Sequence, residues 1–416
     1  MADRWLILAD DLTGAADCAI AFARRGRAAA VTWGAATTVE AGRLPVLAYD
    51  ADSRGLSAQA AAERHAECLA RLLDPDRTLF KKIDSTLRGQ PAAETAAAIT
   101  HLRARAGTAF GICAPAFPAT GRTTVAGRVH VGGRPLEEAE VWARDHTYPS
   151  ADLTVVLASA GVEAETVPLA SVRGPGLASH LERLAAAGER VAVCDAETED
   201  DLDRIAAAGL SGARARFFIG SAGLAHALAA IDGKPPLEPV RIAPGRGGSL
   251  IVVGSLAAAS RAATRKLAAL AGVVHLPVSP GTLLGDPAGT AALAARVEAV
   301  LASGDDALVE IAMAGIPDMA LGPRLAQGLA AALGPVAAGI GAFAATGGET
   351  AAALLSRFGV DGIRLVDEIE PGVSLGLTLG RLSVPVATKA GAFGDADSLV
   401  RIRERLRIVR TEGSFS

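Results

Sequence analysis

Residues 5–17 read WLILADDLTGAAD, and this stretch decides the fold class. An apolar run of strand length, WLILA at 5–9, passes at once into two aspartates and then into an alanine-rich helical pattern. A buried strand followed directly by a helix is the repeating unit of α/β proteins. The stretch therefore predicts a parallel sheet with helices packed on it.

The same alternation of short apolar runs and longer amphipathic stretches continues along the chain, so the predicted fold class is α/β. In the first half, further strands are expected at AAVTW (29–33), PVLAY (45–49), LFKKI (79–83), FGICA (110–114), RVAVC (190–194) and RFFIG (216–220). In the second half they are expected at SLIVVGS (249–255), VVHLPV (273–278), DALVEIAMA (306–314), AFAAT (342–346) and VPVATKAGAFGD (384–395).

The length of 416 residues exceeds what a single hydrophobic core usually serves, so we expect two domains. The segment IDGKPPLEPVRIAPGRGG (231–248) has four prolines and no helical or strand period, which is typical of a linker. We predict domains 1–232 and 249–416 joined by the linker 233–248. Each domain should hold a mostly parallel sheet flanked by helices, with the active site in the cleft between them.

The composition excludes several classes of function. With 41 Lys plus Arg against 45 Asp plus Glu, the net charge of -4 gives no basic field for nucleic acid. No apolar run is long enough for a membrane helix, and the amino terminus lacks the pattern of a secretory leader, so a cytoplasmic protein is expected. The four cysteines are far apart, which is typical of reduced thiols, and the scattered histidines predict no transition-metal site.

Asp10 and Asp11 stand where the first strand ends, at the sheet edge where α/β proteins bind ligands. Their carboxylates could accept hydrogen bonds from substrate hydroxyls, hold magnesium, or take a proton from an attacking hydroxyl. The alternative is that one of them caps the following helix, as Asp commonly does. With two in tandem, at least one is available for another task.

The segment KKIDSTLRG (81–89) places charged and hydroxyl side chains at the exit of another strand. Arg88 can grip a carboxylate with two parallel N–H donors, and Lys82 can neutralise the same anion. Ser85 and Thr86 can meet hydroxyl groups, so the segment suits a polyhydroxy acid. In the alternative interpretation this is a solvated loop; Lys81 in particular is expected to face water.

The stretch 113–138, CAPAFPATGRTTVAGRVHVGGRPLEE, has no helical period and is longer than an ordinary turn. We expect VAGRVHVGG to form a hairpin. Its basic residues Arg122, Arg128 and His130 could close over an anionic substrate, although an ordinary surface hairpin is an equal alternative.

Three glycine-rich transitions from strand to helix in the second half predict a nucleotide site. They are VVGSLAAAS around Ser255, ATGGETAAALL at 345–355, and TKAGAFGDADSL with Lys389, Gly391, Gly394 and Asp395. Backbone N–H groups at such turns can meet phosphate oxygens. Neither GxxxxGK[ST] nor GxGxxG occurs, so the phosphate site must be of another type.

The motifs DDLTGAAD, KKIDSTLRG, PAFPATGRTTVAG, GSAGLA, TGGET and TKAGAFGD, in this order, resemble the motif series of the four-carbon acid sugar kinases. The resemblance spans both halves of the chain. It implies an amino-terminal substrate-binding domain, a carboxy-terminal nucleotide-binding domain, and ATP-dependent phosphorylation of a sugar acid's terminal hydroxyl. Threonate, erythronate and 3-oxo-tetronate are among the substrates of the family.

The resemblance also assigns site residues. The acid-sugar pocket would use Asp10 or Asp11, Arg54 in DADSRG, and the segment from Lys82 to Arg88, which includes Asp84 and Ser85. ATP would meet Ser255, the turn Thr346, Gly347, Gly348 and Glu349, and Gly391.

Phosphoryl transfer mainly requires alignment of the hydroxyl with the γ-phosphate and neutralisation of charge by Mg²⁺ and cations. We expect Arg88 and Lys82 to hold the carboxylate and Asp10 or Asp11 to orient the hydroxyl. Asp11 and Asp395 are the candidate catalytic residues. Helix capping is an equal alternative for Asp395. A non-catalytic sugar-acid sensor and a dehydrogenase are the alternative functions. A homodimer is possible because two-fold oligomers are the commonest.

Overall fold

The computed structural model describes residues 4–34, 39–188, 191–212, 216–231, 233–234, 240–245, 247–255, 257–312, 321–391 and 393–415. The chain divides into two compact units, Met1–Ala29 with Arg43–Pro236, and Ala30–Gly42 with Leu237–Ser416. Residues 30–42 thus pack with the second unit although most of the first unit follows them in sequence. The boundaries 1–232 and 249–416 stay a prediction, and residues 235–239 and 246 of the predicted linker lie outside the described residues.

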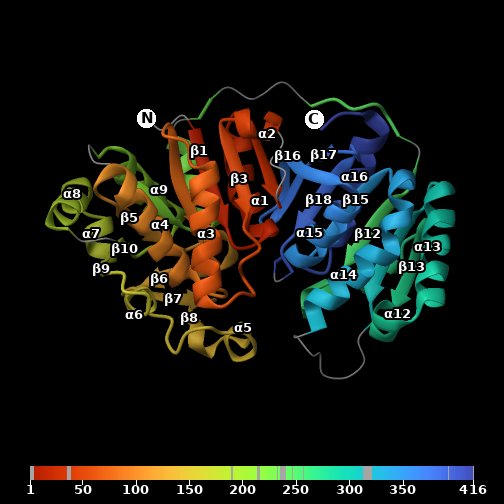
Figure 1. The fold of residues 1–416 in the computed structure, drawn as a ribbon, viewed down its shortest axis with the longest axis horizontal. Helices are drawn as coiled ribbons and strands as arrows, with labels where there is room; N and C mark the ends of the chain where they lie inside the picture. The colour runs from red at the N-terminus through yellow and green to blue at the C-terminus, as the bar shows by residue number, and fades with distance from the viewer. Residues whose placement is uncertain are drawn as a thin grey trace. The chain divides into compact units, whose positions relative to one another are not determined.

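The first unit is built on a parallel sheet in the order β3-β1-β4-β11-β5-β10-β9 (Figure 1). Its strands are β1 (Arg4–Ala9), β3 (Val46–Asp50), β4 (Arg77–Lys82), β5 (Phe110–Ala114), β9 (Ala164–Val167), β10 (Val191–Cys194) and β11 (Arg216–Gly220). Every strand predicted for this unit is present, and β9 is an additional one. In the core, the ring of Trp5 lies 5.2 Å from that of Phe22 and 5.8 Å from that of Phe218, centroid to centroid.

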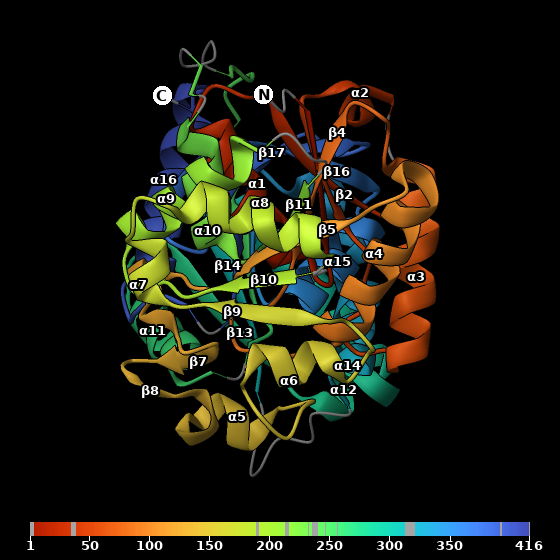
Figure 2. The same cartoon turned by 90° about the vertical axis from the view of Figure 1, so that its left-hand side faces the viewer.

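Helices cover both faces of this sheet. Figure 2 shows α3 and α4 on one side of the strands and α9 and α10 on the other. The helices are α1 (Leu12–Ala23), α3 (Ala58–Leu72), α4 (Pro91–Ala106), α5 (Glu140–Arg144), α6 (Leu153–Ala158), α7 (Leu169–Val172), α8 (Leu177–Ala187), α9 (Glu199–Leu210) and α10 (Ala222–Ile231). Such a doubly covered sheet explains why its strands read as continuous apolar runs.

A small antiparallel sheet, β6-β7-β8, belongs to the same unit. It consists of β6 (Arg122–Val125), β7 (Arg128–Val131) and β8 (Arg134–Pro135). The turn between β6 and β7 has positive φ at Ala126 (51°) and Gly127 (73°), as tight hairpin turns require. The predicted hairpin is therefore confirmed.

The second unit has a mixed sheet in the order β13-β14-β12-β15-β18-β17-β16-β2. Its strands are β2 (Ala29–Trp33), β12 (Ser249–Val253), β13 (Val273–Val278), β14 (Asp306–Ile311), β15 (Ala342–Thr346), β16 (Val360–Glu370), β17 (Val373–Gly380) and β18 (Pro385–Lys389). The strands from β13 to β18 in this order are parallel, whereas β17 runs antiparallel to both β18 and β16. The β16–β17 pair was not predicted; in β16, charged residues interrupt the apolar run VDGIRLVDEIE.

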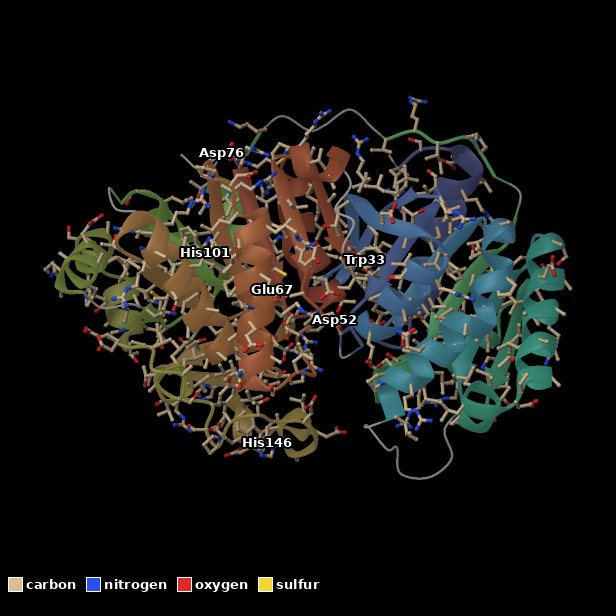
Figure 3. All side chains as sticks on the ribbon, viewed as in Figure 1. Trp33, Asp52, Glu67, Asp76, His101 and His146 are labelled. Carbon is tan, nitrogen blue, oxygen red and sulfur yellow. The ribbon has the colours of Figure 1, made fainter. Side chains whose placement is uncertain are left out.

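The helices of the second unit are α2 (Val39–Arg43), α11 (Ala258–Ala268), α12 (Pro280–Gly285), α13 (Pro287–Ala302), α14 (Gly322–Leu333), α15 (Gly348–Arg357) and α16 (Ser398–Glu412). In Figure 1, α12, α13, α14 and α15 lie toward the viewer. Packing of α11 on α16 covers a core that includes Ile251, Leu267 and Leu406. Trp33, labelled in Figure 3, ties β2 to this unit by donating from its indole Nε1 to the Ser356 hydroxyl at 2.7 Å.

None of the described helices combines the length and the apolar character that crossing a membrane requires. All four cysteines are buried and free, as the sequence predicted.

Candidate functional site

The first candidate site lies where β1, β3 and β4 end. These strands are parallel neighbours, with Leu8 in register with both Tyr49 and Lys81, so the residues that follow each strand meet at one edge of the sheet. This edge brings together the predicted side chains of Asp10, Asp11, Arg54, Lys82, Asp84 and Arg88. We call these six residues the edge cluster.

Arg54 is the centre of the edge cluster. Its Nε and Nη2 donate to the two carboxylate oxygens of Asp10 at 2.8 and 2.9 Å, which is the bidentate geometry of a strong charge-assisted pair. Its Nη1 also donates to Asp11 Oδ2 at 3.0 Å. Arg54 therefore holds both members of the aspartate pair in place.

Asp11 also caps α1, as the sequence analysis allowed for one of the two aspartates. Its Oδ1 accepts from the backbone N–H of Gly14 at 3.1 Å, and its Oδ2 accepts from the Thr13 hydroxyl at 2.8 Å. Lys82 approaches the same carboxylate, with 3.2 Å between Nζ and Asp11 Oδ1. A Cβ at position 14 would lie 2.1 Å from Lys82 Nζ, so a side chain there would displace the lysine from Asp11.

Asp84 and Arg88 form a second bidentate pair within the edge cluster. Arg88 donates from Nε and Nη2 to the two oxygens of Asp84, both at 2.9 Å. The backbone N–H of Thr86 also donates to Asp84 at 3.2 Å, and Ser85 is buried in the same turn. The bond pattern leaves Arg88 Nη1 without an acceptor among the residues that the structure describes, and about a quarter of the side chain (24%) is exposed.

The electrostatics of the edge cluster keep the carboxylates of Asp11 and Asp84 charged. Burial by itself would raise the pKa of Asp11, but Arg54 and Lys82 outweigh it and bring the pKa below the usual value. Burial by itself would also raise the pKa of Asp84, but Arg88 and Arg54 outweigh it and bring the pKa well below its usual value. A carboxylate with a depressed pKa is a weak proton acceptor, so the cluster is better suited to orienting groups than to general base catalysis.

Lys81 departs from the expectation that it faces water. Its side chain is fully buried, and its ammonium lies 2.8 Å from Glu94 Oε2. Successive side chains of a strand point to opposite faces of the sheet, and helices cover both faces of β4. Neither Lys81 nor Lys82 therefore faces solvent across the sheet. Lys81 is thus part of the interior of the unit.

Glu94 connects this buried lysine to the edge cluster. Its Oε1 accepts from the hydroxyl of Ser53 at 2.7 Å and lies 3.4 Å from His65 Nε2. Ser53 precedes Arg54 in a turn that begins at Asp52, whose φ of +50° is in the left-handed region (Figure 3). Glu94 therefore braces the turn that presents Arg54, and neither Glu94 nor His65 was singled out from the sequence.

The hairpin residues have different surroundings. Arg122 lies in the electrostatic field of Asp84 and Arg88, and burial lowers its pKa. Arg128 instead pairs with Glu137, and His130 Nδ1 lies 3.1 Å from the backbone oxygen of Arg128. Of the three basic residues proposed to close over an anion, Arg122 is the one that is coupled to the edge cluster.

The second candidate site lies in the other unit, at the carboxyl ends of β12, β15 and β18. The backbone N–H of Ser255 donates to Thr346 Oγ1 at 3.4 Å, and that of Gly347 donates to the Lys389 oxygen at 2.9 Å. A Cβ on Gly391 would lie 2.5 Å from the Ser255 hydroxyl. The structure thus brings together all three glycine-rich turns predicted from the sequence, and we call them the glycine site.

Gly347 requires its lack of a side chain, because its φ of +92° is strained for any other residue. Gly348 begins α15, and Glu349 lies in the first turn of that helix. This geometry directs backbone N–H groups of the helix start outward from the carboxyl end of β15, as in many phosphate sites.

Asp395 is placed at the start of α16. Its Oδ1 accepts from Arg401 Nη2 at 2.8 Å and from the backbone N–H of Asp397 at 2.8 Å. The bond to Arg401 lowers the pKa of Asp395, and 65% of the side chain is exposed. The bond from the Asp397 N–H agrees with the capping alternative, and the lowered pKa makes Asp395 a weak proton acceptor.

Comparison with known proteins assigns both halves of the chain. Residues 5–228 match the family described as "Sugar-binding N-terminal domain", and residues 250–399 match "Nucleotide-binding C-terminal domain". The chain is 43% identical over 407 residues to a D-threonate kinase of Cupriavidus necator, covering 95% of this chain and 96% of that protein. The chain belongs to the four-carbon acid sugar kinase family.

Other members of the four-carbon acid sugar kinase family are also similar along their full length. A 3-oxo-tetronate kinase of Methylobacterium radiotolerans is 32% identical over 422 residues, covering 94% of this chain and 96% of that one. A crystal structure from Salmonella typhimurium superposes with a TM-score of 0.79 over 96% of this chain and 98% of that chain, at 23% identity. At that identity the likeness shows the fold alone.

Membership of the four-carbon acid sugar kinase family confirms the predicted kinase function, so the protein is a phosphotransferase that acts on an alcohol group. It also confirms the predicted sugar-binding and nucleotide-binding halves. The sensor and dehydrogenase alternatives lose their basis.

Magnesium is implied by kinase chemistry, and the described residues contain no group of three or more His, Cys, Asp or Glu side chains that could hold a metal ion. The carboxylates of Asp10, Asp11 and Asp84 already face Arg and Lys. Mg²⁺ bound through substrate phosphates needs only one or two protein carboxylates, so an ion that arrives with the nucleotide does not require such a group.

Proposed function

We propose that this kinase transfers the γ-phosphoryl group of ATP to the terminal hydroxyl of D-threonate. The observation that carries the proposal is the edge cluster, which combines donors for a carboxylate with acceptors for hydroxyl groups in the sugar-binding half. Among four-carbon acids, D-threonate is favoured because the chain is 43% identical in sequence to the Cupriavidus necator D-threonate kinase and 32% identical to the Methylobacterium radiotolerans 3-oxo-tetronate kinase.

In the proposed complex, Arg88 donates from its outward Nη1 to the substrate carboxylate, and Asp84 fixes the guanidinium plane. Lys82 adds positive charge, and Ser85 meets a hydroxyl group. Asp11 orients the hydroxyl that attacks, while Arg54 positions both Asp10 and Asp11. Phosphoryl transfer depends mainly on such positioning, so a strongly basic carboxylate is not required.

ATP is proposed to bind at the glycine site, which would use Ser255, Thr346, Gly347, Gly348, Glu349 and Gly391. Support comes from the match of residues 250–399 to a nucleotide-binding domain and from the convergence of three turns at one sheet edge. Mg²⁺ would accompany the phosphates and supply neutralisation of their charge. We also propose that the protein is a homodimer, which light scattering would test. A cytoplasmic location is proposed because the four cysteines are free thiols.

The test of the proposed function is ADP release from magnesium-ATP with a panel of D- and L-threonate, D- and L-erythronate, their 3-oxo forms and branched five-carbon acids. D-threonate should give the highest kcat/KM. Preferred turnover of another four-carbon acid would replace the substrate but keep the kinase. No turnover with any member, despite measurable acid binding, would contradict the proposed reaction.

Replacement of Asp11 by Asn should lower kcat by about 10²-fold, a loss typical of misplacing a reacting group, because Asp11 orients the attacking hydroxyl. Asn caps helices as well as Asp does, so the fold of α1 should be retained. Asp395→Asn should have a smaller effect, because Arg401 already engages this carboxylate.

Asp397→Asn is the matched control for Asp395, since Asp397 is a neighbouring carboxylate that pairs with Lys266. Steady-state kinetics on all three variants would check the assignment. Normal turnover in both Asp11→Asn and Asp395→Asn would show that neither residue is catalytic.

A further inference from the structure

Lys389 is a buried cation in the glycine site that the proposed function does not yet use. It is the last residue of β18, in register with Thr346 of β15, and its backbone oxygen accepts from Gly347 N–H at 2.9 Å. Only 1% of its surface is exposed. Lys389 therefore lies at the point where the three glycine-rich turns meet.

The ammonium of Lys389 has few protein partners. Nζ donates to the Ala390 oxygen at 3.2 Å, which satisfies one of its three N–H donors. Within the described part of the chain, no carboxylate oxygen lies within 4.0 Å of this nitrogen. Glu370 is the charged neighbour with the largest influence; its Oε2 accepts from Arg401 Nε at 2.6 Å, and its Oε1 is buried without a hydrogen-bond partner among the described residues and lies beyond 4.0 Å from the Lys389 ammonium.

An ammonium without a close counter-charge is costly to keep in a protein interior. The local chain nevertheless holds the Lys389 side chain closely. A Cβ on Gly394 would lie 3.1 Å from Lys389 Cε, and the φ of Gly394 is +81°, so this position also requires glycine. A cation so enclosed, with donors to spare, is suited to an anion that arrives from outside the protein.

We propose that the Lys389 ammonium binds a terminal phosphate group of the nucleotide. The inference rests on the proposed function, because it takes the glycine site as the nucleotide site. A lysine ammonium is a common phosphate ligand, and oxygen atoms of a β- or γ-phosphate would satisfy its remaining donors and its charge together. Lys389 would thereby take a role that a lysine has in other nucleotide sites, from a different position in the fold.

The alternative is that Lys389 only braces the turn that follows it, through its bond to Ala390. The two roles differ in their dependence on phosphate. Loss of a phosphate contact weakens binding of ATP and ADP and leaves adenosine unaffected, whereas loss of a brace weakens all nucleotides together.

The experiment measures the Kd of ATP, ADP, AMP and adenosine by calorimetry for the full-length protein and for Lys389→Met. Met has a similar length and no charge. We expect ATP to bind roughly ten- to a hundredfold more weakly, as for the loss of a charged hydrogen bond, with unchanged binding of adenosine. An equal loss for all four ligands, or no loss for ATP, would overturn the proposal.

Lys266→Met is the matched control. Lys266 is in the same unit and pairs with Asp397, close in sequence to the same turn, but about half of its side chain is exposed. It should bind every nucleotide as the unchanged protein does. A loss of ATP affinity in this variant equal to that in Lys389→Met would show a general effect of charge and would also overturn the proposal.

A second measurement needs no substitution. Burial lowers the pKa of Lys389 to about 8, against the opposing effects of Glu370 and Asp395. The charged groups that face it are Glu370 on β16, Asp395 before α16, and Arg401 on α16. ATP affinity should therefore fall as the pH rises through about 8 and adenosine affinity should not; a flat ATP profile would contradict the proposal.

These results separate the inference from the proposed function. If the unchanged protein binds ATP but phosphorylates no acid, the proposed reaction fails while the test of Lys389 is still valid. If it phosphorylates D-threonate and Lys389→Met binds ATP normally, the reaction stands and the role of Lys389 is wrong.

Discussion

Arg54→Met is expected to abolish measurable kinase turnover and to lower the free energy of unfolding by about 3–5 kcal/mol, the range for breaking a buried ion pair. Arg54 makes bidentate bonds to Asp10 and a further bond to Asp11. Its loss leaves two neighbouring carboxylates with Lys82 as their nearby cation, so they repel each other and lose their orientation. Chemical denaturation and the ADP-release assay would measure the two effects.

Arg204→Met is a matched control, because Arg204 also pairs with an aspartate but on an exposed helix surface, at 2.9 Å from Asp200. Such exposed pairs contribute roughly 0–1 kcal/mol. Adding Asp10→Asn to Arg54→Met should recover part of the lost stability, since it removes one of the uncompensated charges, but should not recover turnover. Similar losses of stability for Arg54→Met and Arg204→Met would contradict the central role of Arg54.

Glu94→Gln is expected to lower the free energy of unfolding by about 3 kcal/mol or more, because it leaves the ammonium of the fully buried Lys81 without its counter-charge. It should also reduce kcat/KM, since Glu94 braces Ser53 and through it the turn that presents Arg54. Glu63→Gln is a control on the exposed surface of α3, where changes are usually within ±0.5 kcal/mol.

The loss caused by Glu94→Gln should depend on pH. Burial would raise the pKa of Glu94, but Lys81 and His65 outweigh it, so the pKa in the folded protein lies below the ordinary value of 4.5. A carboxylate with a lowered pKa stabilises the fold above its ordinary pKa, and the contribution is lost as the pH falls. The difference from the unchanged protein should therefore be full at neutral pH and shrink below about 4.5; a difference that does not vary with pH would contradict a charge effect.

Sequence reasoning located the strands of both units because each is a continuous apolar run between helices. It missed β9, β16 and β17; in β16, Asp361, Arg364 and Asp367 interrupt the apolar run, and several of its side chains are only partly buried. It also gave no sign that residues 30–42 pack with the second unit, because membership of a unit depends on contacts distant in sequence.

The candidate site was predictable in its residues but not in its bonds. Asp10, Asp11, Lys82, Asp84 and Arg88 stood out by their density after strands, and the family resemblance added Arg54. Nothing local indicated that Asp84 would engage the bidentate donors of Arg88, or that Lys81 would turn inward to Glu94. One sign was available in the sequence. Lys81 and Lys82 are adjacent in a strand covered on both faces, so their side chains point to opposite faces and Lys81 turns inward if Lys82 reaches the sheet edge.

The sequence by itself determined where most of the strands lie, at which ends of them the polar residues stand, and to which family the motif series belongs. These properties depend on local patterns of apolar and polar residues, which are readable along the chain. The tertiary structure alone decided which charges meet: Arg54 reaches Asp10 across 44 positions, and Lys82 reaches Asp11 across 71. Such pairs follow from the order and register of parallel strands, which long-range packing sets. The cations that packing brings to Asp11 and Asp84 outweigh burial and lower the pKa of both.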